Sequence, residues 1–152
     1  MKSICAAFLL SGLVLAGCST DRSMKNTVVE KRETLAVHET RSEFLGLEEH
    51  VCRGLTALCP DRCGHSGSLA RFRVVEYIKF ESFSEYGKKQ ELFSVLVRDN
   101  QGRLKVDQML ADSISRFSPG DIVLLSWNHD YVTKNGSSVP ERPVTKLGRD
   151  FR

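Results

Sequence analysis

The second half of the chain alternates between apolar and polar residues with a period of two, which is typical of strands that bury one face. The clearest example is residues 70–80, where Phe72, Val74, Ile78 and Phe80 share one face. Four further segments have the composition of strands, namely 91–98, 104–109, 122–127 and 139–147. The pattern therefore predicts five strands.

Two other segments have a helical spacing. Apolar residues recur at steps of three and four at Phe44, Leu47, Val51, Leu55 and Leu58. This predicts an N-terminal helix over about residues 42–59, with Ser42 as its N-cap and Pro60 at its end. We expect residues 110–117 to form a short helix or a helical turn between the third and fourth strands. Residues 18–41 are polar and charged, so we expect a flexible tether there, followed by one globular domain over 42–152. As an alternative, Val28-Val29 with Leu35 and Val37 could form a short strand or helix within that segment.

Turn residues and prolines indicate where the later strands begin and which of them lies at the edge of the sheet. Ser118-Pro119-Gly120-Asp121 leads into the most apolar strand, while Pro140 and Pro143 make the last strand an edge strand. The layout over about 69–147 resembles an OB-fold barrel, in which a Pro-Gly-Asp turn is frequent before the fourth strand. An SH3-like barrel or an open antiparallel sheet has nearly the same pattern. The expected fold is mainly β, a small antiparallel five-stranded OB-like barrel preceded by one N-terminal helix.

The first seventeen residues have the layout of a secretory signal. Lys2 is followed by the apolar run 4–16, which is too short for a permanent membrane helix. At the end of this run, Leu15-Ala16-Gly17-Cys18 resembles the lipobox of bacterial lipoproteins. The resemblance implies cleavage after Gly17, a diacylglycerol on the Cys18 thiol and, usually, an acylated amine. Ser19 in the following position favours the outer membrane, facing the periplasm.

Composition excludes some classes of function. The chain has 22 basic and 19 acidic side chains, nearly a balance, whereas nucleic-acid binders usually show a concentrated basic face. We find no Gly-rich phosphate loop, paired-carboxylate constellation or nucleophile elbow, so the sequence nominates no enzymatic reaction. The expected partners are the membrane, through the N-terminal lipid, and an envelope protein or a glycan.

Three cysteines remain once Cys5 leaves with the signal and Cys18 carries lipid. They form the pattern Cys52-x6-Cys59-x3-Cys63-x-His65. Three thiolates and an imidazole are an accepted set for zinc or another transition metal. In an oxidising compartment a disulfide, Cys59–Cys63 or Cys52–Cys63, competes with that reading, and a catalytic thiol–disulfide role is a third alternative.

Aromatic residues supply the other candidate site. Trp127, Tyr131 and Tyr77 could form a binding face for oligosaccharides or extended peptides, with core packing as the alternative for Trp127. His129 could complete a metal site if its strand ends near the cysteines. The sequence thus predicts a lipid-anchored envelope protein with a small β domain for binding or assembly. The alternative is a metal-binding or thiol-redox lipoprotein that uses the cysteine cluster.

Overall fold

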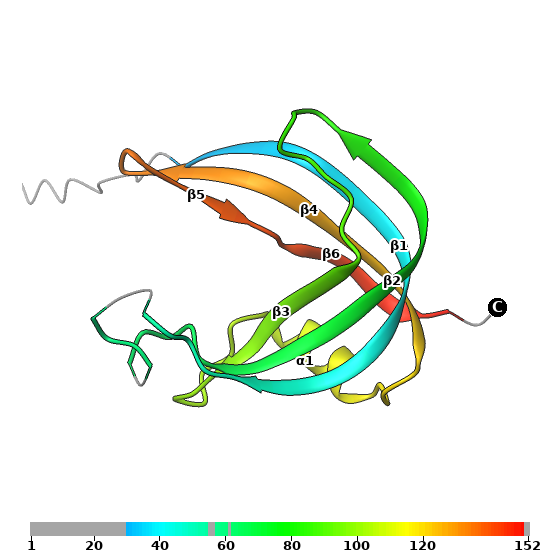
Figure 1. The fold of residues 1–152 in the computed structure, drawn as a ribbon, viewed down its shortest axis with the longest axis horizontal. Helices are drawn as coiled ribbons and strands as arrows, with labels where there is room; N and C mark the ends of the chain where they lie inside the picture. Colours follow the sequence, from blue (N-terminus) through cyan, green and yellow to red (C-terminus); the bar gives the residue numbers. More distant parts are fainter. Residues whose placement is uncertain (1–29, 55–56, 61, 151–152) are drawn as a thin grey trace, which may run out of the picture.

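The computed structural model describes residues 30–54, 57–60 and 62–150. The predictions for the signal peptide, for the lipobox with Cys18 and for the first part of the tether lie outside the described residues. The elements of the described part are β1 (Glu30–His50), β2 (Gly67–Ser82), β3 (Leu92–Asp99), α1 (Gln108–Ser115), β4 (Ile122–Lys134), β5 (Ser137–Glu141) and β6 (Val144–Arg149) (Figure 1). No helix in these ranges has the length and apolar character needed to cross a membrane.

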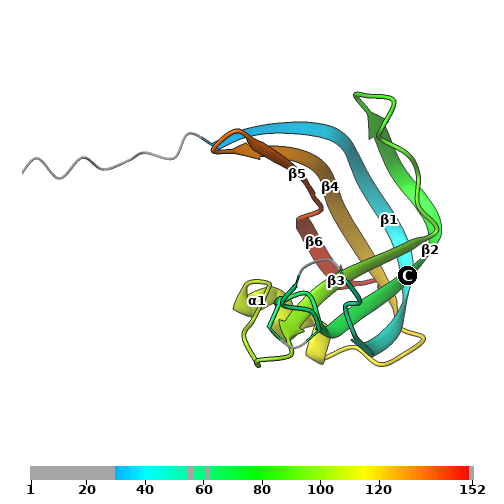
Figure 2. The ribbon, with the colours of Figure 1, turned by 60° about the vertical axis from the view of Figure 1, so that its left-hand side comes forward.

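All six strands belong to one antiparallel sheet built around β1. The strand order is β3-β2-β1-β4-β5, and β6 pairs with β4 as well. β1 pairs with β2 on one side and with β4 on the other. Figures 1 and 2 show β1 and β4 bending together, so the sheet forms an open arch instead of a flat layer. β1 is therefore the strand that connects the two halves of the fold.

The mainly β, antiparallel fold is confirmed, as is a short helix before the strand that contains Trp127. The barrel is corrected in two respects, because the sheet has six strands in the described part of the chain and is not closed there. Pro143 separates β5 from β6, since proline has no backbone N–H for the ladder. The predicted strand 104–109 is also wrong. Leu104 forms only an isolated bridge with Arg98, and Asp107 caps α1 by accepting a hydrogen bond from the Leu110 N–H.

The predicted N-terminal helix over 42–59 is wrong, since residues up to His50 belong to β1. The same strand replaces the predicted tether from Glu30 onward. Along β1 the buried residues alternate over Ala36, His38, Thr40, Ser42 and Phe44. Three of these inward positions are polar, which hid the period of two. Leu47 and Val51, which supported the helix, are instead exposed.

Hydrogen bonds explain how β1 buries polar side chains. The Thr40 hydroxyl donates to the carbonyl oxygen of Leu125 on β4 at 3.0 Å, and it lies 2.9 Å from the Ser42 hydroxyl. A buried hydroxyl with such partners does not carry the full cost of desolvation. The two polar residues therefore stabilise the β1–β4 pairing from inside the sheet.

The core lies where β1, β2, β3 and β4 meet α1. It consists of Phe44, Ala70, Phe72, Phe93, Val97, Ile114, Val123, Leu125 and Trp127. Trp127 is fully buried, and its ring centroid lies 4.5 Å from that of Phe93 and 4.4 Å from that of His38. This packing fixes β4 against β1 and β3, and the rest of β4 extends beyond the core.

Candidate functional site

The connection between β1 and β2 brings three thiols together. The sulfur atoms of Cys52, Cys59 and Cys63 all lie within 4.8 Å of one another, and those of Cys52 and Cys59 are 3.3 Å apart. Cys52 is buried, while Cys59 and Cys63 are half-buried. These three residues form a group that could hold a metal ion. We call it the three-thiol group.

Hydrogen bonds hold this connection against the turn that follows β3. The Ser66 hydroxyl accepts from the Cys52 N–H at 3.0 Å and donates to the Pro60 carbonyl at 2.8 Å. The Asn100 side chain donates to the same carbonyl at 3.3 Å, and its backbone N–H donates to the Ser66 carbonyl at 2.9 Å. The Cys59–Pro60 peptide bond is cis. Because of these hydrogen bonds, the segment that carries the thiols is attached to the end of β3 as well as to β1.

Gly67, the first residue of β2, makes this close approach possible. Its φ is +141°, and a Cβ at this position would lie 2.1 Å from the carbonyl oxygen of Arg98. Only glycine accommodates both the positive φ and the lack of space for a Cβ. The chain that carries the thiols consequently lies directly against the end of β3.

Positive charge lies beside the three-thiol group. A Cβ built on Gly64, the residue after Cys63, would be 3.6 Å from Nη2 of Arg103 and 3.7 Å from Nζ of Lys105. The Arg103 side chain also donates to the Asp99 carboxylate at 2.8 Å, which fixes its position. The Asp99 carboxylate lies 4.0 Å from the same Cβ position, so it offsets part of this positive charge.

The predicted four-ligand set is only partly assembled. His65 is exposed, and it contributes a backbone N–H that points to the Cys63 sulfur at 3.5 Å, while its ring is not part of the group. His129 is not part of the group either. The sulfur atoms of Cys52 and Cys59 lie 3.3 Å apart, a pair that the sequence did not suggest as a disulfide. At 3.3 Å this distance is longer than the disulfide bond of about 2.05 Å.

A second candidate site is a cavity of about 670 Å³ at the other end of the sheet. We call it the tyrosine cavity, and its lining residues are Glu33, Leu35, Ser84, Tyr86, His129, Tyr131 and Pro140. They come from β1, β4, β5 and the connection between β2 and β3. The rings of Tyr86 and Tyr131 are 68% and 43% exposed, so each presents an accessible aromatic surface.

The connection after β2 is held over β1 by close backbone contacts. The Phe83 N–H donates to the Leu35 carbonyl at 2.8 Å, and the Ser82 hydroxyl lies 2.9 Å from the carbonyl of Gly87, to which it donates. A Cβ on Gly87 would lie 2.6 Å from the Leu35 carbonyl oxygen. This glycine therefore permits the approach that places Ser84 and Tyr86 beside the sheet.

The histidine in the tyrosine cavity is kept neutral. Burial lowers the pKa of His129, and the Arg142 guanidinium lowers it further, while Asp130 acts in the opposite direction. A neutral imidazole has one donor and one acceptor nitrogen. With the Glu33 carboxylate and the Ser84 hydroxyl, the cavity thus combines aromatic surface with several hydrogen-bonding groups.

The four predicted binding-face residues divide into two groups. His129 and Tyr131 both line the tyrosine cavity. Trp127 does not belong to a binding face, because its ring is fully buried in the core. Tyr77 has a structural role: its hydroxyl accepts from the Gln90 N–H at 2.7 Å and donates to the Gln90 carbonyl at 3.1 Å. Glu33 and Leu35 were missed because their segment was assigned to the tether.

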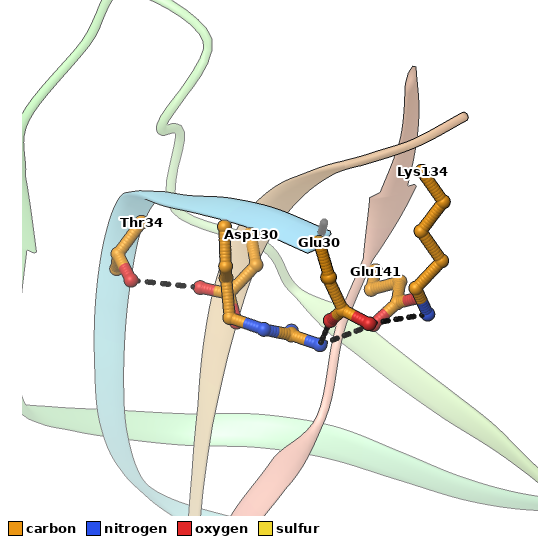
Figure 3. Close-up of polar contacts among 6 residues, drawn as sticks. Glu30, Thr34, Asp130, Lys134 and Glu141 are labelled. Carbon is orange, nitrogen blue, oxygen red and sulfur yellow. Dashed lines mark hydrogen bonds and ion pairs between the residues drawn. The ribbon is translucent and has the colours of Figure 1, made fainter. Parts of the chain in front are cut away.

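Ion pairs lock the strands that carry the cavity (Figure 3). The Arg32 guanidinium on β1 donates to Asp130 on β4 at 2.8 Å and to Glu141 on β5 at 2.9 Å. Asp130, which is buried, also accepts from the Thr34 hydroxyl at 2.9 Å. These carboxylates raise the pKa of Arg32. Side chains alternate along a strand, so Asp130 and its partners lie on the face opposite His129 and Tyr131.

Comparison of the chain with family models, with curated proteins and with solved structures finds no match.

Proposed function

We propose that this chain is a lipid-anchored protein of the bacterial cell envelope whose β domain binds a glycan in the tyrosine cavity. The observation that carries the proposal is the cavity itself, with the accessible rings of Tyr86 and Tyr131 beside the polar groups of Glu33, Ser84 and His129. Aromatic rings pack on the apolar faces of sugars, and carboxylate, hydroxyl and imidazole groups hydrogen-bond to sugar hydroxyls. The anchor rests on the segment Leu15-Ala16-Gly17-Cys18.

The glycan can be tested by titration. Soluble peptidoglycan fragments are titrated into the full chain in detergent and followed by calorimetry or NMR. We expect Tyr131→Ala and Tyr86→Ala each to weaken binding by about tenfold or more, the loss of roughly 1.4 kcal/mol of contact energy. Phe83→Ala is the matched control, because Phe83 is also an exposed aromatic residue of the same connection but does not line the cavity. Equal binding by all three variants would contradict the proposal.

The anchor is tested separately in cells. Cys18→Ser removes the thiol that would receive the diacylglycerol, so we expect the unprocessed chain or a soluble product in place of a processed membrane-bound one. Membrane fractionation and the mass of the N-terminus measure this. If the variant is processed and retained in the membrane like the original chain, the anchor does not depend on Cys18.

A second function is favoured by the three-thiol group. We propose that Cys52, Cys59 and Cys63 hold a metal ion, because three thiolate ligands in reach of one ion are a set that thiophilic metals prefer. Intact mass under non-denaturing conditions tests this function. One metal per chain with three reduced thiols supports it, whereas a loss of two hydrogens with no metal indicates a disulfide.

A further inference from the structure

We infer that the three-thiol group is a site for a single monovalent copper ion, bound by three sulfur atoms alone; this inference rests on the second proposed function. A closed structural zinc site almost always has four protein ligands. Among the described residues the group contains three, since the rings of His65 and His129 are not part of it. Monovalent copper prefers soft sulfur ligands and is satisfied by three of them.

The distances fit one ion. Thiolates bound to a common ion at about 2.3 Å lie roughly 3.8–4.0 Å apart. In the three-thiol group every sulfur pair is within 4.8 Å, and the sulfur atoms of Cys52 and Cys59 are 3.3 Å apart. Small rotations of the side chains therefore suffice for all three sulfur atoms to reach one ion. Each thiol loses its proton when it binds, so the metal is held more tightly as the pH rises.

The surroundings suit the charge of such a site. Three thiolates and one monovalent cation carry a net charge of minus two, which needs compensation when it is partly buried. The side chains of Arg103 and Lys105 supply positive charge next to Gly64, and the Asp99 carboxylate offsets only part of it. Divalent zinc would leave less negative charge to compensate. The two basic side chains therefore favour the monovalent ion.

The partial exposure of Cys59 and Cys63 suits exchange of the ion. Cys52 is only 2% exposed, but Cys59 and Cys63 are half-buried. One side of the group is thus inside the protein and another is accessible from solvent. Ligands from solvent can approach a bound ion from the accessible side, so this geometry suits uptake and release of copper.

The test uses the full chain with Cys5→Ser and Cys18→Ser, so that the three thiols of the group are the only ones. The reduced chain is titrated with monovalent copper under anaerobic conditions against a chromophoric copper chelator. We expect one copper per chain and an X-ray absorption spectrum with sulfur neighbours only. Cys63→Ser should weaken binding by more than about 100-fold, beyond the loss usual for a residue that merely supports a ligand.

His65→Ala is the matched control and should bind copper like the parent chain. A nitrogen neighbour in the spectrum, together with weaker binding by His65→Ala, would overturn the three-sulfur copper site while leaving metal binding intact. A reduced chain that binds neither copper nor zinc would overturn both this inference and the second proposed function. Near-ultraviolet circular dichroism of Trp127 verifies that Cys63→Ser is folded; if it is not, the spectrum of the parent chain and the His65→Ala titration still decide.

Discussion

His38 lies face to face with Trp127, with ring centroids 4.4 Å apart and ring planes 11° from parallel. Both side chains are fully buried, and among the described residues neither His38 Nε2 nor Trp127 Nε1 has a hydrogen-bond partner. Burial lowers the pKa of His38 to about 4, with His129 and Arg142 acting in the same direction. The stacked pair is therefore a neutral part of the core at neutral pH.

The pair predicts a loss of stability in acid. The pKa of His38 is about 4 in the folded chain and 6.5 in the unfolded chain, so the unfolded state binds the proton first. Stability should be constant above about pH 6.5, fall between pH 6.5 and 4, and lose about 3 kcal/mol in total. Urea unfolding followed by Trp127 fluorescence measures this, since Trp127 is the only tryptophan of the chain.

His38→Phe supplies the control for that prediction. The variant keeps an aromatic ring against Trp127 but cannot be protonated. We expect its stability to change much less than that of the parent chain between pH 6.5 and 4. An identical pH dependence in the two chains would show that other groups, His129 first among them, cause the effect.

Asp130 and Glu30 both contact Arg32, and they predict different losses. Asp130 is buried and accepts from Arg32 and Thr34, so Asp130→Ala should lower the free energy of unfolding by about 2 kcal/mol. Glu30 is exposed, so Glu30→Gln should leave stability unchanged within experimental error. The urea concentration at the midpoint of unfolding measures both losses of stability, provided that the slope of the unfolding free energy against urea is unchanged. Equal losses would mean that burial does not set the strength of these ion pairs.

Gly67 predicts a backbone effect on the three-thiol group. Gly67→Ala places a Cβ 2.1 Å from the Arg98 carbonyl at a φ of +141°, so we expect a loss of more than about 2 kcal/mol. The thiols of Cys59 and Cys63 should also become more reactive toward alkylating agents. Gly148→Ala is the control, because nothing lies within 4 Å of its Cβ position, and it should be nearly neutral.

The three cysteines should differ in their rates of alkylation. Cys52 is buried, whereas Cys59 and Cys63 are half-buried. With the metal-free, reduced chain we expect Cys52 to react about tenfold more slowly than the other two, since access limits the reaction. Peptide mass spectrometry after timed quenching gives each rate. Equal rates would indicate that the connection between β1 and β2 opens readily in solution.

Alternation predicted β2, β3 and β4 from the sequence because their buried positions are mostly apolar. The segment around Phe72 and Val74 illustrates this, and its strand was found as expected. β1 was not found, because its inward residues His38, Thr40 and Ser42 are polar. The hydroxyls of Thr40 and Ser42 are hydrogen-bonded and the His38 ring stacks on Trp127, contacts that only the folded sheet supplies. A sequence pattern shows only the polarity of each residue. A buried hydroxyl that has a hydrogen-bond partner therefore cannot be distinguished from a hydroxyl on the surface.

The candidate sites show the same limit. Proximity in sequence indicated that Cys52, Cys59 and Cys63 would meet, and they do. It also included His65, whose ring is not part of the group. The tyrosine cavity combines β1 with residues about fifty and a hundred positions away, such as Tyr86 and Tyr131. No local pattern can reveal such a combination.

If the chain is lipid-anchored as proposed, the early start of β1 limits the distance between the domain and the membrane. If Cys18 carries lipid, only residues 19–29 separate the anchor from Glu30. Even fully extended, that segment spans at most about 40 Å. Glu33 and Leu35 follow within a few residues of the start of β1. The tyrosine cavity therefore lies at the end of the domain to which the anchor is attached. A lipid-anchored chain could then bind only ligands in the layer of the envelope next to the lipid surface. Inserting residues between Cys18 and Glu30 should let the cavity reach ligands farther from the membrane.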